Sequence, residues 1–220
     1  MGNLQRFDVK GAVHLKNIKY FMETGTLHGD ALEFVDGLGC ETLEELHSVE
    51  LLDELYEGCV KRFEGRDNIH LHKGMSVDVL KEILSSDALD GNTFFWLDAH
   101  YPGADIGKEL YIQEGKEEKE VLPLEQELRV ISELRGDKYD DIIICDDLWI
   151  YEDGEYGCHA KTLDKHMELY CNGETKEQIG RPNADFVEEL FGKTHNIEKN
   201  KLDQGYIIIT PLEKETTSNA

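Results

Sequence analysis

The chain has 220 residues, with 23 Lys and Arg against 47 Asp and Glu, so its formal net charge at pH 7 is −24 with the histidines neutral. A surface this negative repels phosphate backbones and anionic lipid headgroups, which excludes an electrostatically driven nucleic-acid or membrane binder. Apolar residues make up 40 % of the chain and 20 glycines add to them, which is enough for the core of one globular domain.

The cysteines and the N-terminal residues indicate the cellular compartment in which the protein is expected. No run of about 18 apolar residues exists, and residues 1–10 lack the apolar stretch of a signal peptide. The five cysteines are odd in number and have no CxxC spacing, which is typical of reduced thiols. We therefore expect a cytoplasmic protein. An alternative is a zinc site, although its spacing matches no usual structural pattern; it would use Cys158, His159, His166 and Cys171.

Short β-type runs alternate with longer segments of helical period as far as Cys145. In chain order, strands are predicted at Ile18–Met22, His47–Val49, Asn68–Leu71, Thr93–Leu97 and Asp141–Cys145. Helices are predicted between them, at Asp30–Leu38, Leu51–Phe63, Ser76–Leu84 and Leu124–Leu134. This alternation is typical of βα units around a parallel sheet.

The C-terminal part has a different pattern. His195–Lys201 and Tyr206–Pro211 are strand-like and only four residues apart, which allows a hairpin but no helical crossover. The sequence thus predicts an α/β fold with a seven-stranded, mostly parallel sheet, an antiparallel C-terminal hairpin and helices on both faces. We expect one domain over 1–212, with a lid loop at 102–121, a cap insertion at 149–183 and a disordered tail at 213–220.

A loop with two glycines connects the first predicted strand to the first helix. Gly25 and Gly29 have GxxxG spacing, so the GxGxxG fingerprint of pyrophosphate-binding loops is not met. Gly25 would let a ligand approach the backbone closely, and Gly29 would allow a tight start to the helix. Glu23, an acid at the end of a buried strand, requires a cation or hydrogen-bond donors, and an amino-acid ammonium would satisfy it. The loop therefore predicts a site for a charged amino-acid group.

Two further polar residues follow the next two strands. Glu50 closes the second strand, where a carboxylate can accept both hydroxyls of a ribose. Ser76 follows the third strand, at a turn that lies near the adenine in such folds. Each also has a plainer interpretation, as a solvated glutamate and a helix N-cap serine. Taken with the first loop, they predict one ligand with a ribose, an adenine and an amino-acid tail.

Carboxylates also end the fourth and fifth strands. Asp98 follows one, and Asp146 and Asp147 follow the other; neighbouring strands are about 4.8 Å apart, so the three would converge. A divalent cation such as Mg²⁺ would neutralise them. The alternative is that Asp147 caps the next segment and Asp98 faces solvent. His100 has an ordinary pKa of about 6.5 and is the predicted general base, unless it is a surface histidine; His28 is the reserve candidate.

These motifs resemble the class I S-adenosylmethionine-dependent methyltransferases, which have a Rossmann-like fold, and especially the metal-dependent sugar O-methyltransferases of the macrocin and novobiocin type. The resemblance covers Lys19 to Ile150 and the terminal hairpin. It implies that the methionine part of the cofactor is held by Glu23, Gly25, Thr26 and Gly29. Glu50 would bind the ribose, Ser76 would lie by the adenine, and Asp98 would contact the cofactor as well as the metal.

The same resemblance assigns the metal ligands and the acceptor. Asp98, Asp146 and Asp147 would bind Mg²⁺, and His100 takes the base position, where the family often has an aspartate. The implied reaction is methyl transfer to a sugar hydroxyl, for example of a deoxyhexose such as rhamnose in a glycan or glycoside. Alternatives are a small-phenol or catechol O-methyltransferase, a metal-dependent hydrolase using the same carboxylates, and a non-enzymatic acidic interaction module. We expect a small-molecule or glycan acceptor, no nucleic acid and no membrane, and make no prediction of the oligomeric state.

Overall fold

A computed structural model of the chain describes residues 3–99, 122–152, 155–157 and 183–213. Several predicted features lie outside these residues: His100, the lid loop 102–121, the alternative zinc ligands, most of the cap insertion 149–183 and all but the first residue of the tail 213–220.

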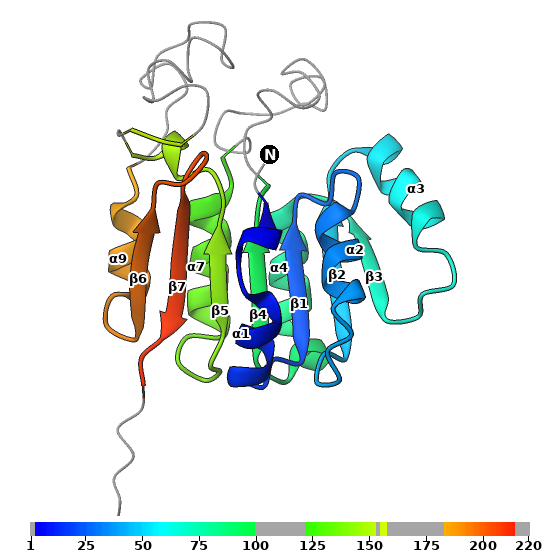
Figure 1. Cartoon of the computed structure of the whole chain (residues 1–220), viewed down its shortest axis with the longest axis horizontal. Coiled ribbons are helices and arrows are strands. Elements are labelled where there is room, and N and C mark those ends of the chain that lie inside the picture. The colour runs from blue at the N-terminus through cyan, green and yellow to red at the C-terminus, as the bar shows by residue number, and fades with distance from the viewer. Residues whose placement is uncertain (1–2, 100–121, 153–154, 158–182, 214–220) are drawn as a thin grey trace, which may run out of the picture.

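The centre of the fold is one seven-stranded sheet with the strand order β3-β2-β1-β4-β5-β7-β6 (Figure 1). Strands β1 to β5 run parallel, while β7 is antiparallel to both β5 and β6. This confirms the predicted sheet and its closing hairpin. The strands are β1 (Tyr20–Thr24), β2 (Glu45–Glu50), β3 (Ile69–Lys73), β4 (Thr93–Leu97), β5 (Ile142–Cys145), β6 (His195–Asn200) and β7 (Tyr206–Pro211).

Helices cover both faces of the sheet because successive residues of its central strands are buried on opposite sides (Figure 1). One core includes Phe21 and Phe94; the other includes Met22 and Phe95. The helices on the first face are α1 (Val9–Leu15), α2 (Asp30–Gly37) and α3 (Asp53–Arg62). Those on the second face are α4 (Ser76–Ser85), α7 (Leu124–Leu134) and α9 (Asp185–Phe191). Three short 3-10 helices complete the described elements: η1 (Leu4–Arg6), η2 (Asp87–Leu89) and η3 (Leu148–Ile150).

The first strand lies two residues later than the sequence pattern predicts. Ile18 is fully buried, like a strand residue, but its N–H donates to the carbonyl of Val13 at the end of α1. Ile18 therefore lies in the turn that closes the C-terminal end of α1, and Glu23 lies inside β1. The pattern also did not predict α1 and α9, because each spans only seven residues, about two helical turns.

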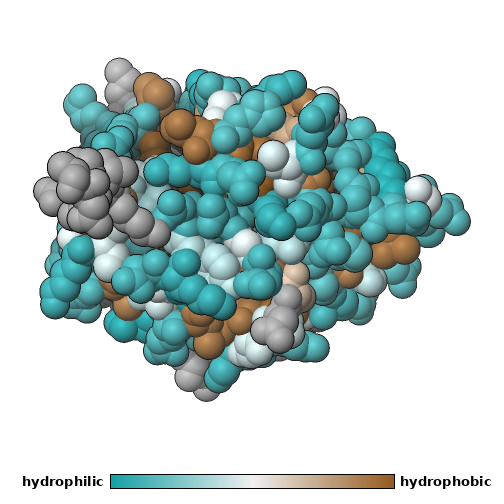
Figure 2. Space-filling model, turned by 90° about the horizontal axis from the view of Figure 1, so that it is seen from below, coloured by the Kyte–Doolittle hydropathy of each residue, from teal (hydrophilic) through white to brown (hydrophobic). Residues whose placement is uncertain are grey.

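No helix in the described ranges is long and apolar enough to cross a membrane. The face at the amino ends of the parallel strands is mostly hydrophilic, with small separated apolar areas (Figure 2). This distribution agrees with the strongly acidic composition.

Candidate functional site

A pocket lies at the carboxyl ends of β1 and β4, and its space, part of it open to solvent, is about 520 Å³. Among the predicted cofactor residues, Glu23, Gly25, Thr26 and Asp98 line it, whereas Gly29, Glu50 and Ser76 do not. The remaining lining residues are Asn3, Leu4, Gln5, Leu27, His28, Asp30, Ala31, Phe34 and Trp96.

Gly25 lines the pocket and packs against the backbone of Asp98, the residue that follows β4. Its φ of +84° lies in the left-handed region, and its N–H donates to the carbonyl of Val49 over 3.0 Å. A Cβ atom at this position would lie 2.7 Å from the backbone oxygen of Asp98. Only glycine fits here, so the loop after β1 packs directly on the backbone that follows β4.

Glu23 is a buried acid inside the pocket wall, 2 % exposed. The Ser48 hydroxyl donates to Glu23 Oε2 over 2.6 Å, so the Thr26 hydroxyl, 2.6 Å from Ser48 Oγ, must donate to Ser48. Burial raises the pKa of Glu23 well above its ordinary value, and the carboxylates of Asp98, Glu50 and Asp30 raise it further. The site therefore favours a cation beside this carboxyl group.

Substituting Glu23→Gln tests this environment in the free protein. A raised pKa means that Glu23 holds its proton more tightly in the folded protein than in the unfolded chain. The stability that this protonated group contributes is therefore fully present below the unfolded pKa of 4.5 and is lost as the pH rises through the folded pKa. We expect the two proteins to be equally stable near pH 4, and the variant to become increasingly more stable as the pH rises. Urea unfolding midpoints across this range measure the difference; parallel curves would contradict the assignment.

Glu50 holds the same loop from the next strand. Its Oε2 accepts the N–H of Leu27 over 2.9 Å and its Oε1 accepts the N–H of Leu52 over 2.8 Å. Burial raises the pKa of Glu50, and these backbone hydrogen bonds oppose the rise. The carboxylate thus fixes the turn that contains Leu27, and its predicted contact with a ribose stays a prediction.

Gly29 and Ser76 begin helices near the pocket. Gly29 occupies the N-cap position of α2 with a φ of +81°, and a Cβ there would lie 2.5 Å from Phe63 Cε2. Its small size therefore lets α2 begin against the Phe63 ring. Ser76 is the first residue of α4 and Met75 is the N-cap, so the interpretation of Ser76 as a capping serine is wrong. Its predicted place beside the adenine stays untested.

The predicted metal aspartates have neighbouring backbones. Leu97 pairs with Cys145, so Asp98 and Asp146 are the first residues after adjacent strands. Asp146 and Asp147 are each 2 % exposed, and the N–H of Asp147 donates to Asp146 Oδ1 over 2.8 Å. The ligand atoms of the three carboxylates do not, however, all lie within 4.8 Å of one another. Among the described residues, the group that meets this distance is Glu45, His47 and His70.

The N-terminal segment is part of the pocket that the sequence did not predict. Asn3, Leu4 and Gln5 line it, and η1 is held in place by an ion pair between Arg6 and Asp203. These partners are 197 residues apart, and nothing in the local pattern indicates such a contact. Only the folded chain brings the first residues over the pocket.

Comparisons with solved structures identify the fold. The chain resembles the S-adenosylhomocysteine-bound methyltransferase PaMTH1 of Podospora anserina, with a TM-score of 0.60, 16 % identity and coverage of 97 % of this chain and 80 % of that chain. It has the class I methyltransferase fold. A protein assigned as a caffeoyl-CoA O-methyltransferase from Staphylococcus aureus gives a TM-score of 0.59, with 10 % identity over 96 % and 85 % of the two chains.

A third similar structure is the Bacillus cereus O-methyltransferase in complex with S-adenosylhomocysteine, at a TM-score of 0.58 and 12 % identity, covering 96 % of this chain and 82 % of that one. No family model and no curated protein matches the sequence. The resemblance to class I methyltransferases is thus confirmed for the fold, while the sugar-specific type is not.

Proposed function

We propose that the protein is an S-adenosylmethionine-dependent O-methyltransferase. The observation that supports this most strongly is the combination of Glu23 and Gly25 in one pocket of a class I methyltransferase fold. Glu23 offers a buried carboxyl group to a cation, and Gly25 lets the loop after β1 pack on the backbone of Asp98, which also lines the pocket. The similar structures are described as methyltransferases, two of them bound to S-adenosylhomocysteine, which supports the same class of enzyme.

The residues of the pocket would bind and orient the cofactor. S-adenosylmethionine, when bound, supplies an electrophilic methyl group on a sulfonium. Glu23 would hold the amino-acid ammonium, with Ser48 and Thr26 fixing the carboxylate by their hydrogen bonds. The acidic surroundings, including Asp98 and Asp30, favour a positively charged ligand. Leu4 and Gln5 would exclude water from one side of the pocket.

Calorimetric titration with S-adenosylhomocysteine tests the proposal. We expect micromolar binding, and a release of protons at pH values where the free protein holds Glu23 protonated, because an ammonium beside Glu23 lowers the pKa of its carboxyl group. Titrations in two buffers of different ionisation enthalpy measure that release, and Glu23→Gln should abolish it. Absence of binding would overturn the methyltransferase proposal; binding without proton release would overturn only the role of Glu23.

We further propose that transfer requires Mg²⁺ held by Asp98, Asp146 and Asp147. Its support is the adjacency of the two strand ends; because the three side chains do not converge within 4.8 Å, no step is assigned to the ion. Asp146→Asn should lower turnover at least about 100-fold while cofactor affinity changes little. The exposed Asp53→Asn is the matched control. Undiminished turnover of Asp146→Asn, or activity that survives a chelator, would contradict the proposal.

The acceptor proposed is a sugar hydroxyl, with His100 as the base, on the strength of the sequence resemblance. A small phenol is the second candidate, because one similar structure is assigned as a caffeoyl-CoA O-methyltransferase and Trp96 lines the pocket here. A panel of rhamnosides and catechols with labelled S-adenosylmethionine separates the two. Hydrolysis without S-adenosylmethionine would favour the metal-dependent hydrolase instead.

A further inference from the structure

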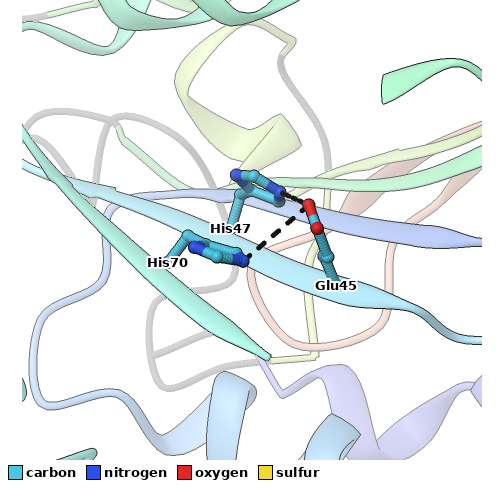
Figure 3. Close-up of side chains that lie close together, drawn as sticks. All are labelled: Glu45, His47 and His70. Atoms are coloured by element: carbon cyan, nitrogen blue, oxygen red, sulfur yellow. Dashed lines mark hydrogen bonds and ion pairs between the residues drawn. The ribbon is translucent and has the colours of Figure 1, made fainter. Parts of the chain in front are cut away.

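A second cluster of polar side chains lies on β2 and β3, on the opposite face of the sheet from Glu23 and Glu50. Glu45 and His47 are two residues apart on β2 and share one face of the sheet, and His70 is the direct partner of His47 on β3 (Figure 3). Glu45 lies five positions before Glu50, about 17 Å along the strand, so the cluster begins far from the edge of the sheet at which the pocket lies. The proposed methyl transfer uses none of these residues.

The three side chains present their ligand atoms to a common point. Glu45 Oε2 is 3.1 Å from His47 Nε2 and 3.8 Å from His70 Nε2, and all three ligand atoms lie within 4.8 Å of one another (Figure 3). Two ligand atoms about 2.0–2.1 Å from a tetrahedral zinc ion are about 3.3 Å apart. The two distances from Glu45 Oε2 lie on either side of that value, and the two imidazole ligand atoms are within 4.8 Å of each other.

The chemistry of the cluster also suits a metal ion. His47 is 5 % exposed, and its Nε2 faces the Glu45 carboxylate. Two imidazoles and a carboxylate are ligands that zinc accepts in proteins. The Glu45 and His70 side chains are 41 % and 40 % exposed, whereas the His70 Nε2 atom is buried and has no hydrogen-bond partner.

His72 supplies the support that a ligating histidine usually has. His47 Nδ1 lies 3.1 Å from His72 Nε2, and the two rings are parallel within 8°. With a metal on His47 Nε2, the proton of His47 moves to Nδ1 and is donated to His72 Nε2. Such an outer hydrogen bond fixes both the tautomer and the ring orientation of a metal ligand.

We propose that Glu45, His47 and His70 form a Zn²⁺ site that links β2 to the edge strand β3, with water in the remaining position. Two imidazoles and one carboxylate favour zinc over Mg²⁺, which prefers oxygen ligands and retains its water. The ion joins an edge strand to its neighbour and binds the folded chain, so it stabilises the native state.

The test is a competition titration of the full chain with Zn²⁺ and a chromophoric chelator, in excess Mg²⁺ to occupy any oxygen site. We expect one zinc ion per chain, and affinity reduced at least about 10-fold in His70→Gln and in Glu45→Gln. His14→Gln, an exposed histidine on α1, is the matched control and should bind as the wild type does. Substituting Co²⁺ should give a visible absorption spectrum that His70→Gln removes.

Glu45 and His70 are only partly buried, so both can be substituted without creating a cavity in the core. The thermal unfolding temperature in the presence of a chelator should be the same for the variants and the wild type, which checks that the variants fold. S-adenosylhomocysteine binding should be the same in all of them, so the fate of the zinc site and that of the methyltransferase proposal are independent. Failure to bind zinc, or equal affinity in the wild type and both variants, would overturn the site. Zinc that is lost in Cys158→Ser but kept in His70→Gln would also overturn it.

Discussion

Substituting Asp141→Asn is expected to destabilise the protein by about 3–5 kcal/mol, the largest stability effect that we predict. The side chains of Asp141 and Arg135 are each 3 % exposed and form a two-point ion pair, with Nε–Oδ2 and Nη2–Oδ1 distances of 2.6 and 2.9 Å. The variant removes the negative charge and leaves the Arg135 guanidinium buried without its counter-ion.

Other bonds of this pair make the loss hard to compensate. Arg135 also donates to the carbonyls of Leu89 and Gly91 over 2.9 and 2.6 Å, and Asp141 accepts the N–H of Thr93 over 2.7 Å. The pair therefore connects the end of α7, the start of β5 and the segment before β4. Because the guanidinium nitrogens of Arg135 donate to buried acceptors, rotating the guanidinium away would leave the carbonyls of Leu89 and Gly91 without these hydrogen bonds.

The exposed pair between Arg129 and Glu125 on α7 is the matched control for that experiment. Glu125→Gln removes a carboxylate from a 2.7 Å ion pair between partly exposed side chains four residues apart, and should cost less than about 1 kcal/mol. Urea unfolding of both variants measures the comparison. If Asp141→Asn costs no more than Glu125→Gln, the buried pair does not stabilise the fold as argued.

Substituting Gly25→Ala is expected to have the largest effect on the pocket. The new methyl group would lie 2.7 Å from the Asp98 carbonyl oxygen, and alanine is strained at a φ of +84°. Because backbone would have to move, we expect a loss of about 2 kcal/mol or more of stability and at least about 10-fold weaker S-adenosylhomocysteine binding.

Gly37→Ala provides the control for this variant. Gly37 ends α2, has nothing within 4 Å of its absent Cβ and has no positive φ, so alanine there should be neutral or slightly stabilising. Thermal unfolding and calorimetry of the two variants measure both effects. Wild-type affinity in Gly25→Ala would show that the loop does not approach the ligand.

The succession of the strands and of most helices along the chain was predictable from the sequence. Runs such as Phe94–Leu97 and Ile142–Cys145 are continuously apolar because their strands are buried on both faces, and short spacing after Asn200 allows only a hairpin. Local patterns of this kind depend on neighbours along the chain. For the same reason Glu23 and Gly25, which line the pocket, could be selected as candidate residues before the fold was known, whereas Gly29 does not line it.

Contacts between distant segments were decided only by the tertiary structure. No local pattern indicates that Arg6 pairs with Asp203, so the first residues could not be assigned to the pocket. The cluster of Glu45, His47 and His70 depends on the register of β2 with β3, because a shift by one residue would turn His70 to the other face. The sequence by itself therefore determined the strands, the helices α2, α3, α4 and α7, and which strand ends carry polar groups. The short helices α1 and α9 and the convergence of side chains depended on register and packing, which only the folded chain specifies.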